Sequence, residues 1–321
     1  LYKSGVASFT ATPNTFNADN YAVYLQDTIE FIPKWDLLLG VRRDEMRAEY
    51  SSSTSPQLSY GENSYRTGLS YHYSPDSHYY VSWSDSFSPT ADLYQLTVAP
   101  QPAERSKTIE LGAKWLFMDG DLTFRTALYR AIKDWERNTD LESTAAILTK
   151  KRRTNGLELE MTGRITDDWE VFAGVAFMDA KILEVAENVN ATTGAITVAD
   201  ARYKGQRARN TPTATLNIWT TYNLTSEWKV GAGVEAKGER YAYVPSSAVA
   251  SQFATGSFQP NAAPGYARVD MMVAYELPKW ALRLNVKNLL DKTYYDAVYD
   301  NGGLVVPGND RQAILTAEYK F

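Results

Sequence analysis

The sequence contains no cysteine and only two histidines, His72 and His78. Without cysteine, a disulfide framework and a thiolate metal site are excluded, and two histidines are too few to favour a histidine-based metal centre. The mean hydropathy is −0.39, and without a run of about 18 apolar residues a transmembrane helix is excluded. The net charge of −5 argues against nucleic acid as a partner. We therefore expect no cofactor, and any metal that the protein handles would arrive already chelated.

Aromatic residues are abundant, and one tryptophan pattern recurs. The 321 residues include 22 tyrosines, 11 phenylalanines and 8 tryptophans. Four tryptophans follow a short turn and precede apolar residues at every second position: Trp35, Trp169, Trp228 and Trp280. The alternation is that of a β-strand, and tryptophans at the same strand end are typical of an aromatic girdle at a membrane–water boundary. A soluble sandwich is the alternative, but these segments run to about ten residues, whereas soluble strands average about 5–6.

Thirteen alternating segments predict thirteen strands. They span residues 21–31, 35–49, 64–73, 77–87, 107–117, 122–135, 152–165, 169–181, 211–224, 228–240, 266–277, 280–290 and 310–321. The connections alternate between short turns and long loops, as in outer-membrane barrels, whose turns are periplasmic and whose loops are extracellular. We therefore predict an all-β protein, a transmembrane antiparallel β-barrel, in which the first predicted strand descends from outside.

The odd number of strands is informative, because bacterial single-chain barrels close with an even number. At least one earlier strand is therefore expected to be missing. The chain also starts at Leu1, without an initiator methionine or a signal peptide. We interpret residues 1–321 as the C-terminal portion of a barrel that lacks its N-terminal part.

The polar face of the predicted strands carries charges of both signs. The inward-pointing set is Glu110, Lys114, Arg125, Glu158, Glu160, Arg164, Glu235, Lys237, Arg283 and Lys287. Such a face predicts a lumen that is wet or filled by a polar plug. The carboxylate pair Glu158 and Glu160 would suit acid–base chemistry, but the sequence places no catalytic partner beside it, so we interpret the pair as lumen residues and expect no enzyme.

Basic and aromatic residues gather at the ends of strands and in the long loops. The run of residues 150–153 fits an anionic ligand or lipopolysaccharide phosphates, or else the solvated base of a loop. Aromatic rings with arginine donors suit a planar, anionic ligand. The ligand-binding candidates are Arg105, Arg137, Tyr203, Arg209, Tyr241, Tyr294, Tyr295 and Tyr299. For each tyrosine the alternative is an ordinary interfacial aromatic above the membrane.

The C-terminal residues resemble a known family. Residues 285–295 read NVKNLLDKTYY, residues 308–312 read GNDRQ, and the chain closes on Tyr319-Lys320-Phe321. Upstream, SKTIELGAKW at 106–115 and DGDL at 119–122 are similar to a hairpin of siderophore receptors, and RNTP at 209–212 also fits. Together these motifs resemble TonB-dependent outer-membrane receptors. RNTD at 137–140 looks most like the catecholate branch.

The resemblance implies a barrel of about 22 strands that encloses an N-terminal plug. It implies transport of a ferric siderophore, of catecholate type, with energy relayed by TonB. It also implies a location in the outer membrane of a Gram-negative bacterium, in contact with lipid and lipopolysaccharide. Phe321 would be the assembly signal for the barrel-assembly machinery. The chain departs from the family because it lacks the plug, the TonB-contacting segment and about nine strands.

Two other functions stay open at this point. A passive porin or structural barrel shows the same girdle and the same alternation, so periodicity does not separate it from a receptor. A barrel enzyme, such as a surface lipase or protease, would need a histidine-containing catalytic constellation. Here His72 and His78 share one short hairpin, which does not favour the enzyme.

Overall fold

The structure is a computed structural model that describes residues 16–50, 57–88, 103–137, 147–185, 187–189, 196–198, 204–242, 262–298 and 305–321. Its main element is one antiparallel sheet of 13 strands, in which each long strand pairs with the next along the chain. The order is β1-β2-β3-β4-β5-β6-β7-β8-β11-β12-β15-β16-β19. The thirteen predicted strands and their meander are therefore confirmed.

The long strands extend beyond the predicted bounds at several ends. They are β1 (Phe16–Ile32), β2 (Trp35–Tyr50), β3 (Gln57–Ser74), β4 (Ser77–Ser88), β5 (Glu104–Phe117), β6 (Leu122–Arg137), β7 (Ile147–Thr166), β8 (Trp169–Val185), β11 (Ala214–Asn223), β12 (Trp228–Lys237), β15 (Tyr266–Glu276), β16 (Trp280–Lys287) and β19 (Gln312–Tyr319). The largest extensions are at the starts of β1, β3 and β7. In β1 and β3 the added residues are polar or glycine on the face that carries apolar side chains further along the strand. Continued pairing with β2 holds these residues in the sheet.

Three short hairpins and one 3₁₀ turn complete the described elements. β9 (Glu187–Val189) pairs with β10 (Ile196–Val198), β13 (Arg240–Tyr241) with β14 (Ala262–Ala263), and β17 (Tyr295–Val298) with β18 (Val305–Pro307). The 3₁₀ turn η2 (Met118–Gly120) joins β5 to β6. Segments of two to four residues are too short to show an alternating pattern, so the sequence did not predict these strands within the long loops. In the described part of the chain, no helix is long and apolar enough to cross a membrane.

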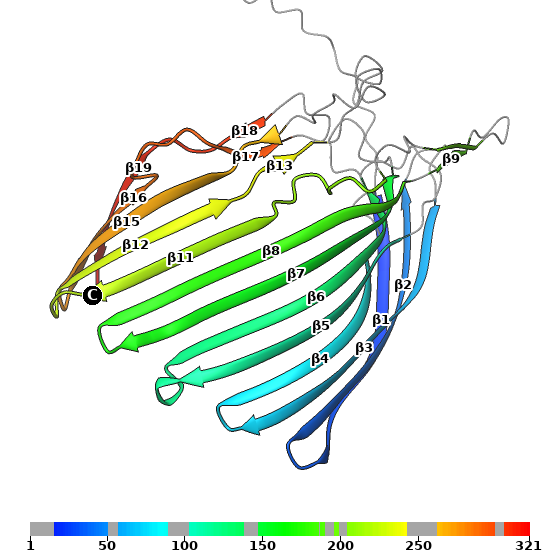
Figure 1. Cartoon of the computed structure of the whole chain (residues 1–321), viewed down its shortest axis with the longest axis horizontal. Coiled ribbons are helices and arrows are strands. Elements are labelled where there is room, and N and C mark those ends of the chain that lie inside the picture. Colours follow the sequence, from blue (N-terminus) through cyan, green and yellow to red (C-terminus); the bar gives the residue numbers. More distant parts are fainter. Residues whose placement is uncertain are drawn as a thin grey trace, which may run out of the picture.

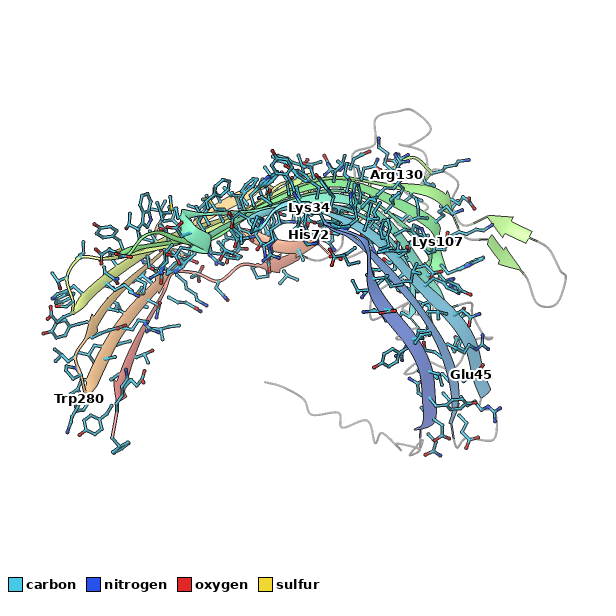
Figure 2. The ribbon with its side chains drawn as sticks, turned by 90° about the horizontal axis from the view of Figure 1, so that it is seen from below. Lys34, Glu45, His72, Lys107, Arg130 and Trp280 are labelled. Atoms are coloured by element: carbon cyan, nitrogen blue, oxygen red, sulfur yellow. The ribbon has the colours of Figure 1, made fainter. Side chains whose placement is uncertain are left out.

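The sheet curls into an arch, with β1 and β19 as its two edges (Figures 1 and 2). Short turns join the strands at one end of the wall, which we call the turn end. The long connections leave from the opposite end, the loop end (Figure 1). Because a single curved sheet forms the wall in the described part of the chain, the soluble sandwich is wrong, since it requires two sheets packed face to face.

The convex face carries a continuous row of apolar side chains, four of the five exposed. Residues directly opposite one another on paired strands share a face, and the register aligns Val81, Leu111, Leu128, Leu157 and Phe177 across β4 to β8. We call this row the apolar belt. Leu111 and Leu128 are 58% and 57% exposed. An apolar surface of this extent needs a nonaqueous neighbour, as the lipid-facing wall of a membrane barrel has.

The concave face is polar, and tyrosine rings on it pack against glycines of the neighbouring strands. Tyr80 lies over Gly112 and donates a hydrogen bond of 2.6 Å to Glu110, and a Cβ on Gly156 would come within 2.3 Å of the Tyr129 ring. Glu160 forms an ion pair of 3.2 Å with Arg125. The charged face predicted for the lumen thus lines the inside of the arch, and Glu160 has a structural partner there.

Candidate functional site

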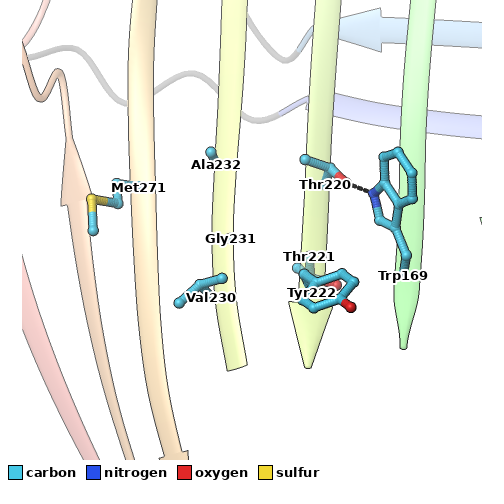
Figure 3. A pocket seen from close by; sticks show the side chains of 8 residues that line it. All are labelled: Trp169, Thr220, Thr221, Tyr222, Val230, Gly231, Ala232 and Met271. Carbon is cyan, nitrogen blue, oxygen red and sulfur yellow. Dashed lines mark hydrogen bonds between the residues drawn. The ribbon is translucent and has the colours of Figure 1, made fainter. Parts of the chain in front are cut away.

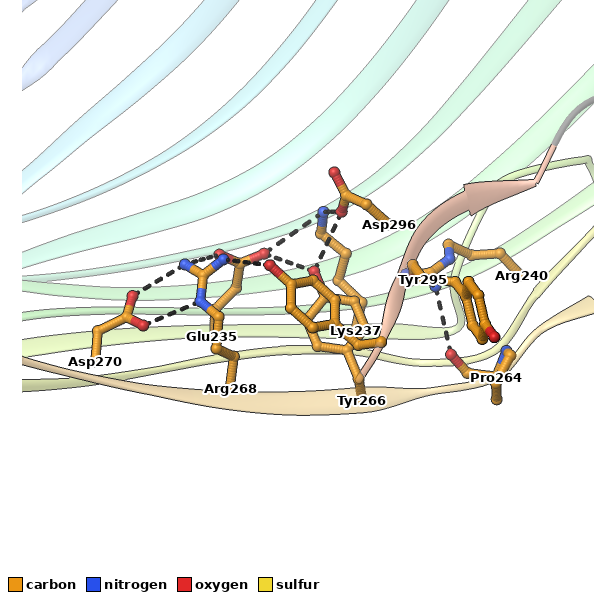
Figure 4. A network of polar contacts seen from close by, with 10 residues as sticks. Glu235, Lys237, Arg240, Pro264, Tyr266, Arg268, Asp270, Tyr295 and Asp296 are labelled. Carbon is orange, nitrogen blue, oxygen red and sulfur yellow. Dashed lines mark hydrogen bonds and ion pairs between the residues drawn. The ribbon is translucent and has the colours of Figure 1, made fainter. Parts of the chain in front are cut away.

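Charged and aromatic side chains converge at the loop end of β12, β15 and the β17 segment (Figure 4). Arg268 donates from Nη2 to Glu235, at 2.8 Å, and from Nε and Nη2 to the two oxygens of Asp270, at 3.0 and 2.9 Å. A third donor, Nη1, reaches the Tyr294 hydroxyl at 3.0 Å. The guanidinium is thus held by two carboxylates and one phenol. This bidentate geometry makes the position of Arg268 well defined.

A second set of contacts attaches β17 to the wall. Lys237 donates to Asp296 at 2.7 Å, and the Tyr266 hydroxyl lies 2.8 Å from Glu235 and 3.2 Å from Asp296. The hydrogen bond from the Lys237 ammonium group lowers the pKa of Asp296 below its ordinary value. Because Asp296 belongs to the final long connection, these bonds fix that loop over the inner wall.

Arg240 is a buried cation beside this network. It is 2% exposed, its Nη2 donates to the carbonyl oxygens of Tyr295 (2.6 Å) and Pro264 (3.4 Å), and its guanidinium carbon lies 5.4 Å from the centre of the Tyr266 ring. Its Nε and Nη1 atoms are buried without a hydrogen-bond partner. The contacts join β13 and β14 to β17 and add positive charge to the same region.

Two asparagines organise the loops around the network. Asn210 accepts a hydrogen bond of 3.0 Å from the Val298 backbone N–H, and its Nδ2 donates to the Val298 carbonyl. Asn288, 1% exposed, has a positive φ of 51° and donates from Nδ2 to the carbonyls of Lys292 (2.9 Å) and Asn309 (3.1 Å). Its Oδ1 accepts from the Lys292 N–H at 2.9 Å. Both side chains therefore replace backbone partners that irregular loops lack.

Four of the predicted ligand residues gather in this region. Tyr241 is half-buried beneath the guanidinium of Arg207, with 4.6 Å between the guanidinium carbon and the ring centre. Its hydroxyl donates to Glu239, which raises the pKa of Tyr241. The half-buried Tyr295 packs against Ala242, Ala263 and Val298.

Tyr294 and Arg209 are the other two. Tyr294 is only 5% exposed, and its ring centre lies 4.4 Å from that of Tyr266. It therefore supports the site from beneath. Arg209 is half-buried, and its carbonyl accepts a hydrogen bond of 3.0 Å from the Thr211 hydroxyl.

The remaining candidates lie elsewhere. Arg105, on β5, is bound to Glu62, to Asp85 (3.0 Å) and to the Asn63 carbonyl (2.9 Å), so its donors are used within the wall. Arg137 ends β6, where its backbone pairs with Ile147. Tyr203 and Tyr299 lie outside the described residues. The structure thus brings Arg209, Tyr241, Tyr294 and Tyr295 together and leaves Arg105 apart.

Sequence reasoning missed the residues that hold the site together. These are Arg240, Arg268, Asp270, Asn210 and Asn288. Alternation along β15 would have placed Arg268 and Asp270 on the inner face with Glu235, because opposite residues share a face. The roles of the two asparagines depend on contacts between loops, for which strand periodicity contains no signal.

The predicted girdle residues occupy equivalent places at the turn end. Trp35, Trp169, Trp228 and Trp280 are the first residues of β2, β8, β12 and β16. Three of them pack, with tilted rings, against a tyrosine of the neighbouring strand, with ring centres 4.7 Å apart in Trp35–Tyr71 and Trp228–Tyr275 and 4.6 Å apart in Trp280–Tyr319. Trp280 is seen at the rim of the arch in Figure 2. The girdle function of these residues stays a prediction.

An apolar hollow of about 460 Å³ lies beside Trp169 (Figure 3). The small side chain of Ala232 leaves it open between Trp169 and Met271, and the Trp169 indole donates to the Thr220 hydroxyl at 2.7 Å. By register, Trp169, Thr220 and Ala232 share the face of the apolar belt. The hollow therefore belongs to the convex wall, away from the polar site. Among the described residues, no group of three or more acidic, histidine or cysteine side chains has the arrangement of a metal site.

A curved antiparallel meander with an apolar convex face, a charged concave face and all long loops at one end defines an outer-membrane type of β-barrel chain. Comparison with known proteins identifies the family. Residues 2–289 match the family described as "TonB dependent receptor-like, beta-barrel". The chain belongs to this family, and it is therefore a β-barrel chain of the Gram-negative outer membrane.

Individual relatives agree with this assignment. The chain is 30% identical to the probable TonB-dependent receptor BfrD of Bordetella pertussis, over 96% of this chain and 42% of that protein. It is 28% identical to the probable TonB-dependent siderophore receptor PiuA of Acinetobacter baumannii, over 94% of this chain and 41% of PiuA. The crystal structure of PiuA superposes with a TM-score of 0.79 and 26% identity, over 96% of this chain and 44% of that structure. The chain thus spans less than half the length of these relatives.

Proposed function

We propose that this chain forms the C-terminal part of the barrel of a receptor that imports ferric siderophores, of the catecholate type, with energy relayed from TonB. The family membership supports the class of protein. The siderophore is supported by the name of PiuA, and the catecholate branch by 24% identity to the catecholate siderophore receptor Fiu of Escherichia coli over 94% of this chain. These relatives are transport receptors, which supports a function other than catalysis.

The observation that carries the proposal is the cluster of arginines and tyrosines at the loop end. A ferric catecholate is anionic and presents planar catechol rings, so it suits guanidinium donors and aromatic faces. Tyr241 and Tyr295 are half-buried there, and Arg207 and Arg240 add positive charge around them. The network of Arg268, Glu235 and Asp270 beneath holds the cluster in place, which lowers the entropy lost on binding.

The proposed partners extend beyond this chain. TonB and the plug would contact it through segments that the family supplies N-terminal to the region matched here. Phe321 would be read by the barrel-assembly machinery, and the convex face would contact membrane lipid and lipopolysaccharide. The tryptophans Trp35, Trp169, Trp228 and Trp280 would mark the periplasmic boundary.

The test measures siderophore binding by a full-length receptor that contains this chain, in detergent. Binding is monitored by the quenching of tryptophan fluorescence. We expect saturable binding of a ferric catecholate with a Kd below about 1 μM, or about −8 kcal/mol, and weaker binding of ferric hydroxamates and apo-siderophores. Binding of ferric hydroxamates alone would refute the catecholate assignment. Failure to bind any ferric chelate, together with open ion conductance in planar bilayers, would replace the receptor with a porin.

A pair of variants places the site. Tyr241→Leu removes the ring beneath Arg207 and should weaken ferric catecholate binding about fivefold, as expected for the loss of an aromatic contact with the ligand worth about 1 kcal/mol. Tyr222→Leu is the matched control, because Tyr222 is a 46% exposed tyrosine at the turn end of β11. Equal effects of the two substitutions would contradict a site at the loop end.

A further inference from the structure

The convex wall carries a compact group of cations between the apolar belt and the loop end. The group comprises Lys107 on β5, Arg130 on β6, Arg153 on β7 and Lys181 on β8, and we call it the outer basic patch. The register sets Lys107 opposite Ile132, Ile132 opposite Arg153, and Arg153 opposite Lys181. Because neighbouring strands lie about 4.8 Å apart, four charges are concentrated on adjacent strands.

The patch faces away from the lumen. Arg130 follows Leu128 by two positions on β6, and Lys107 precedes Leu111 by four positions on β5, so each shares the face of the apolar belt. Lys107 and Arg130, both labelled in Figure 2, are exposed. At about 3.4 Å per residue, these positions lie roughly 7 to 14 Å along the strands beyond the belt. A ligand inside the barrel does not reach this surface.

The patch has few counter-charges of its own. Asp179 lies 3.4 Å from Lys181 and 3.9 Å from Arg153. Arg130 donates to the neutral amide of Asn155 at 2.8 Å. Within the part of the chain that the structure describes, Lys107 and Arg130 have no ion-pair partner.

Carboxylates on either side of the patch are already engaged with other cations. Asp85, opposite Lys107, accepts from Arg105 at 3.0 Å, and Asp134 lies 3.8 Å from Lys151. Four cations and one carboxylate, Asp179, leave the patch with a charge of about +3 in a chain whose net charge is −5.

The structure also divides the basic run of residues 150–153. Arg152 pairs in register with Lys133 and forms an ion pair of 2.8 Å with Glu136, whereas Arg153 belongs to the opposite face. Consecutive residues of a strand point to opposite faces, so only part of the run contributes to the outer surface. The outer basic patch is thus made by register across four strands, and the run in the sequence supplies one of its four members.

We propose that the outer basic patch binds the phosphate groups of the glycolipid in the outer leaflet. An exposed cationic surface immediately beyond a lipid-facing apolar belt lies at the depth of the headgroups. Lysine and arginine at this depth bind phosphate oxygens, and arginine does so with paired donors. This inference deepens the lipopolysaccharide contact of the proposed function and depends on the outer-membrane location alone, so it stands whether or not the receptor binds a siderophore.

The experiment measures glycolipid binding by native mass spectrometry on the full-length, delipidated receptor in detergent. The probes are deep-rough lipopolysaccharide with its lipid A phosphates intact, the same glycolipid after dephosphorylation, and phosphatidylglycerol. Wild-type protein should bind the phosphorylated glycolipid at least about tenfold more tightly than either other lipid, with a strong dependence on salt. Millimolar inorganic phosphate should not displace it, because the free ion lacks the acyl chains that the apolar belt contacts.

The double variant Lys107→Glu/Arg130→Glu should lower the affinity for the phosphorylated glycolipid by at least about thirtyfold, since each reversal replaces an attraction by a repulsion. The charge-conserving variant Lys107→Arg/Arg130→Lys should bind within about threefold of wild type. So should Lys34→Glu/Lys279→Glu, which reverses the same number of charges in the turns between β1 and β2 and between β15 and β16. These variants control for folding and for net charge.

Equal binding of phosphorylated and dephosphorylated glycolipid would overturn the proposal, and so would equal binding of phosphatidylglycerol. Unchanged binding in the double charge-reversal variant would place the phosphates elsewhere on the protein. Ferric siderophore binding measured on the same samples separates the two proposals. Normal siderophore binding without phosphate selectivity would refute the patch alone, whereas phosphate selectivity without siderophore binding would refute the transport function alone.

Discussion

Asn288 offers the sharpest test of how the loop end is held together. The residue lies just after β16, is 1% exposed and adopts a φ of 51°. Its side chain makes three hydrogen bonds, two with Lys292 and one with the Asn309 carbonyl. Its backbone N–H donates to Asp270 at 2.8 Å, which links it to the network around Arg268. Replacement by alanine removes all three side-chain hydrogen bonds. It also leaves the left-handed backbone conformation to a residue whose side chain cannot form a local hydrogen bond.

The expected cost follows from these contacts. Each side-chain hydrogen bond contributes about 1 kcal/mol net, so their loss costs about 3 kcal/mol. Asparagine tolerates a positive φ better than alanine does, and we assign about 1 kcal/mol to this difference. Asn288→Ala should therefore destabilise the loop attachment by about 4 kcal/mol, and Asn288→Gly, which is free of the conformational strain, by about 3 kcal/mol.

The assay is hydrogen exchange of backbone amides in the full-length receptor. The reporters are the Leu289 N–H, bound to the Val269 carbonyl at 2.8 Å, and the Gly308 N–H, bound to the Tyr294 carbonyl at 2.8 Å. Neither bond uses the Asn288 side chain, so faster exchange reports opening of the loop. A loss of 4 kcal/mol corresponds to about a thousandfold faster exchange, while amides of β7 should be unaffected.

Two results would refute the reasoning. An acceleration below tenfold at both reporters in Asn288→Ala would mean that the side chain does not hold the loop. Identical exchange in the alanine and glycine variants would mean that the left-handed backbone adds no cost of its own. The first result would also remove the hydrogen-bond explanation for asparagine at this position of the C-terminal motif.

Three further predictions test other parts of the molecule. Gly156→Ala should lower the free energy of unfolding in urea by about 1–3 kcal/mol, because its Cβ would meet a tyrosine ring at 2.3 Å. Gly174→Ala should be neutral, because its Cβ meets nothing within 4 Å. Equal effects of the two substitutions would contradict the packing. Asp296→Asn should cost at most about 1 kcal/mol at pH 7, because the ion pair with Lys237 is partly exposed. The pKa of Asp296 is lowered in the folded protein, so its contribution is present above the ordinary carboxyl pKa and is lost as the pH falls through the folded value; a cost that persists at lower pH would exclude this ion pair. Phe321→Ala should reduce the amount of barrel assembled in the outer membrane, measured by heat-modifiable mobility, and leave the unfolding midpoint of assembled protein unchanged, because Phe321 is fully exposed; normal assembly would refute the assembly signal.

The C-terminal motif illustrates how resemblance and structure differ as evidence. The stretch NVKNLLDKTYY resembles the family, and Tyr294 and Tyr295 in it were predicted to bind ligand. In the structure Tyr294 is 5% exposed and supports Arg268, while Asn288 ties the loop to the sheet. The motif therefore has a clear role in shaping the loop end, and the half-buried Tyr295 stays the better ligand candidate of the two.

The sequence by itself determined the thirteen strands, their order and the two faces of the wall. Alternation is a local property with a period of two residues, so each segment reveals its strand and its apolar side without knowledge of its neighbours. Short turns make consecutive strands pair, because a hairpin leaves little choice of partner. The tryptophans at the starts of β2, β8, β12 and β16 were readable for the same reason.

Only the tertiary structure decided which charged and aromatic side chains meet. Asn210 and Val298 are 88 residues apart in the chain, yet they form hydrogen bonds with each other. Arg268 binds Glu235 because the register of β12 and β15 places the two residues opposite each other. The outer basic patch likewise exists because register aligns Lys107, Ile132 and Arg153. Register depends on turns, bulges and contacts between distant loops, and a shift of one residue would move every side chain to the opposite face. For this reason local patterns determined the wall of the barrel, while nonlocal packing determined its sites.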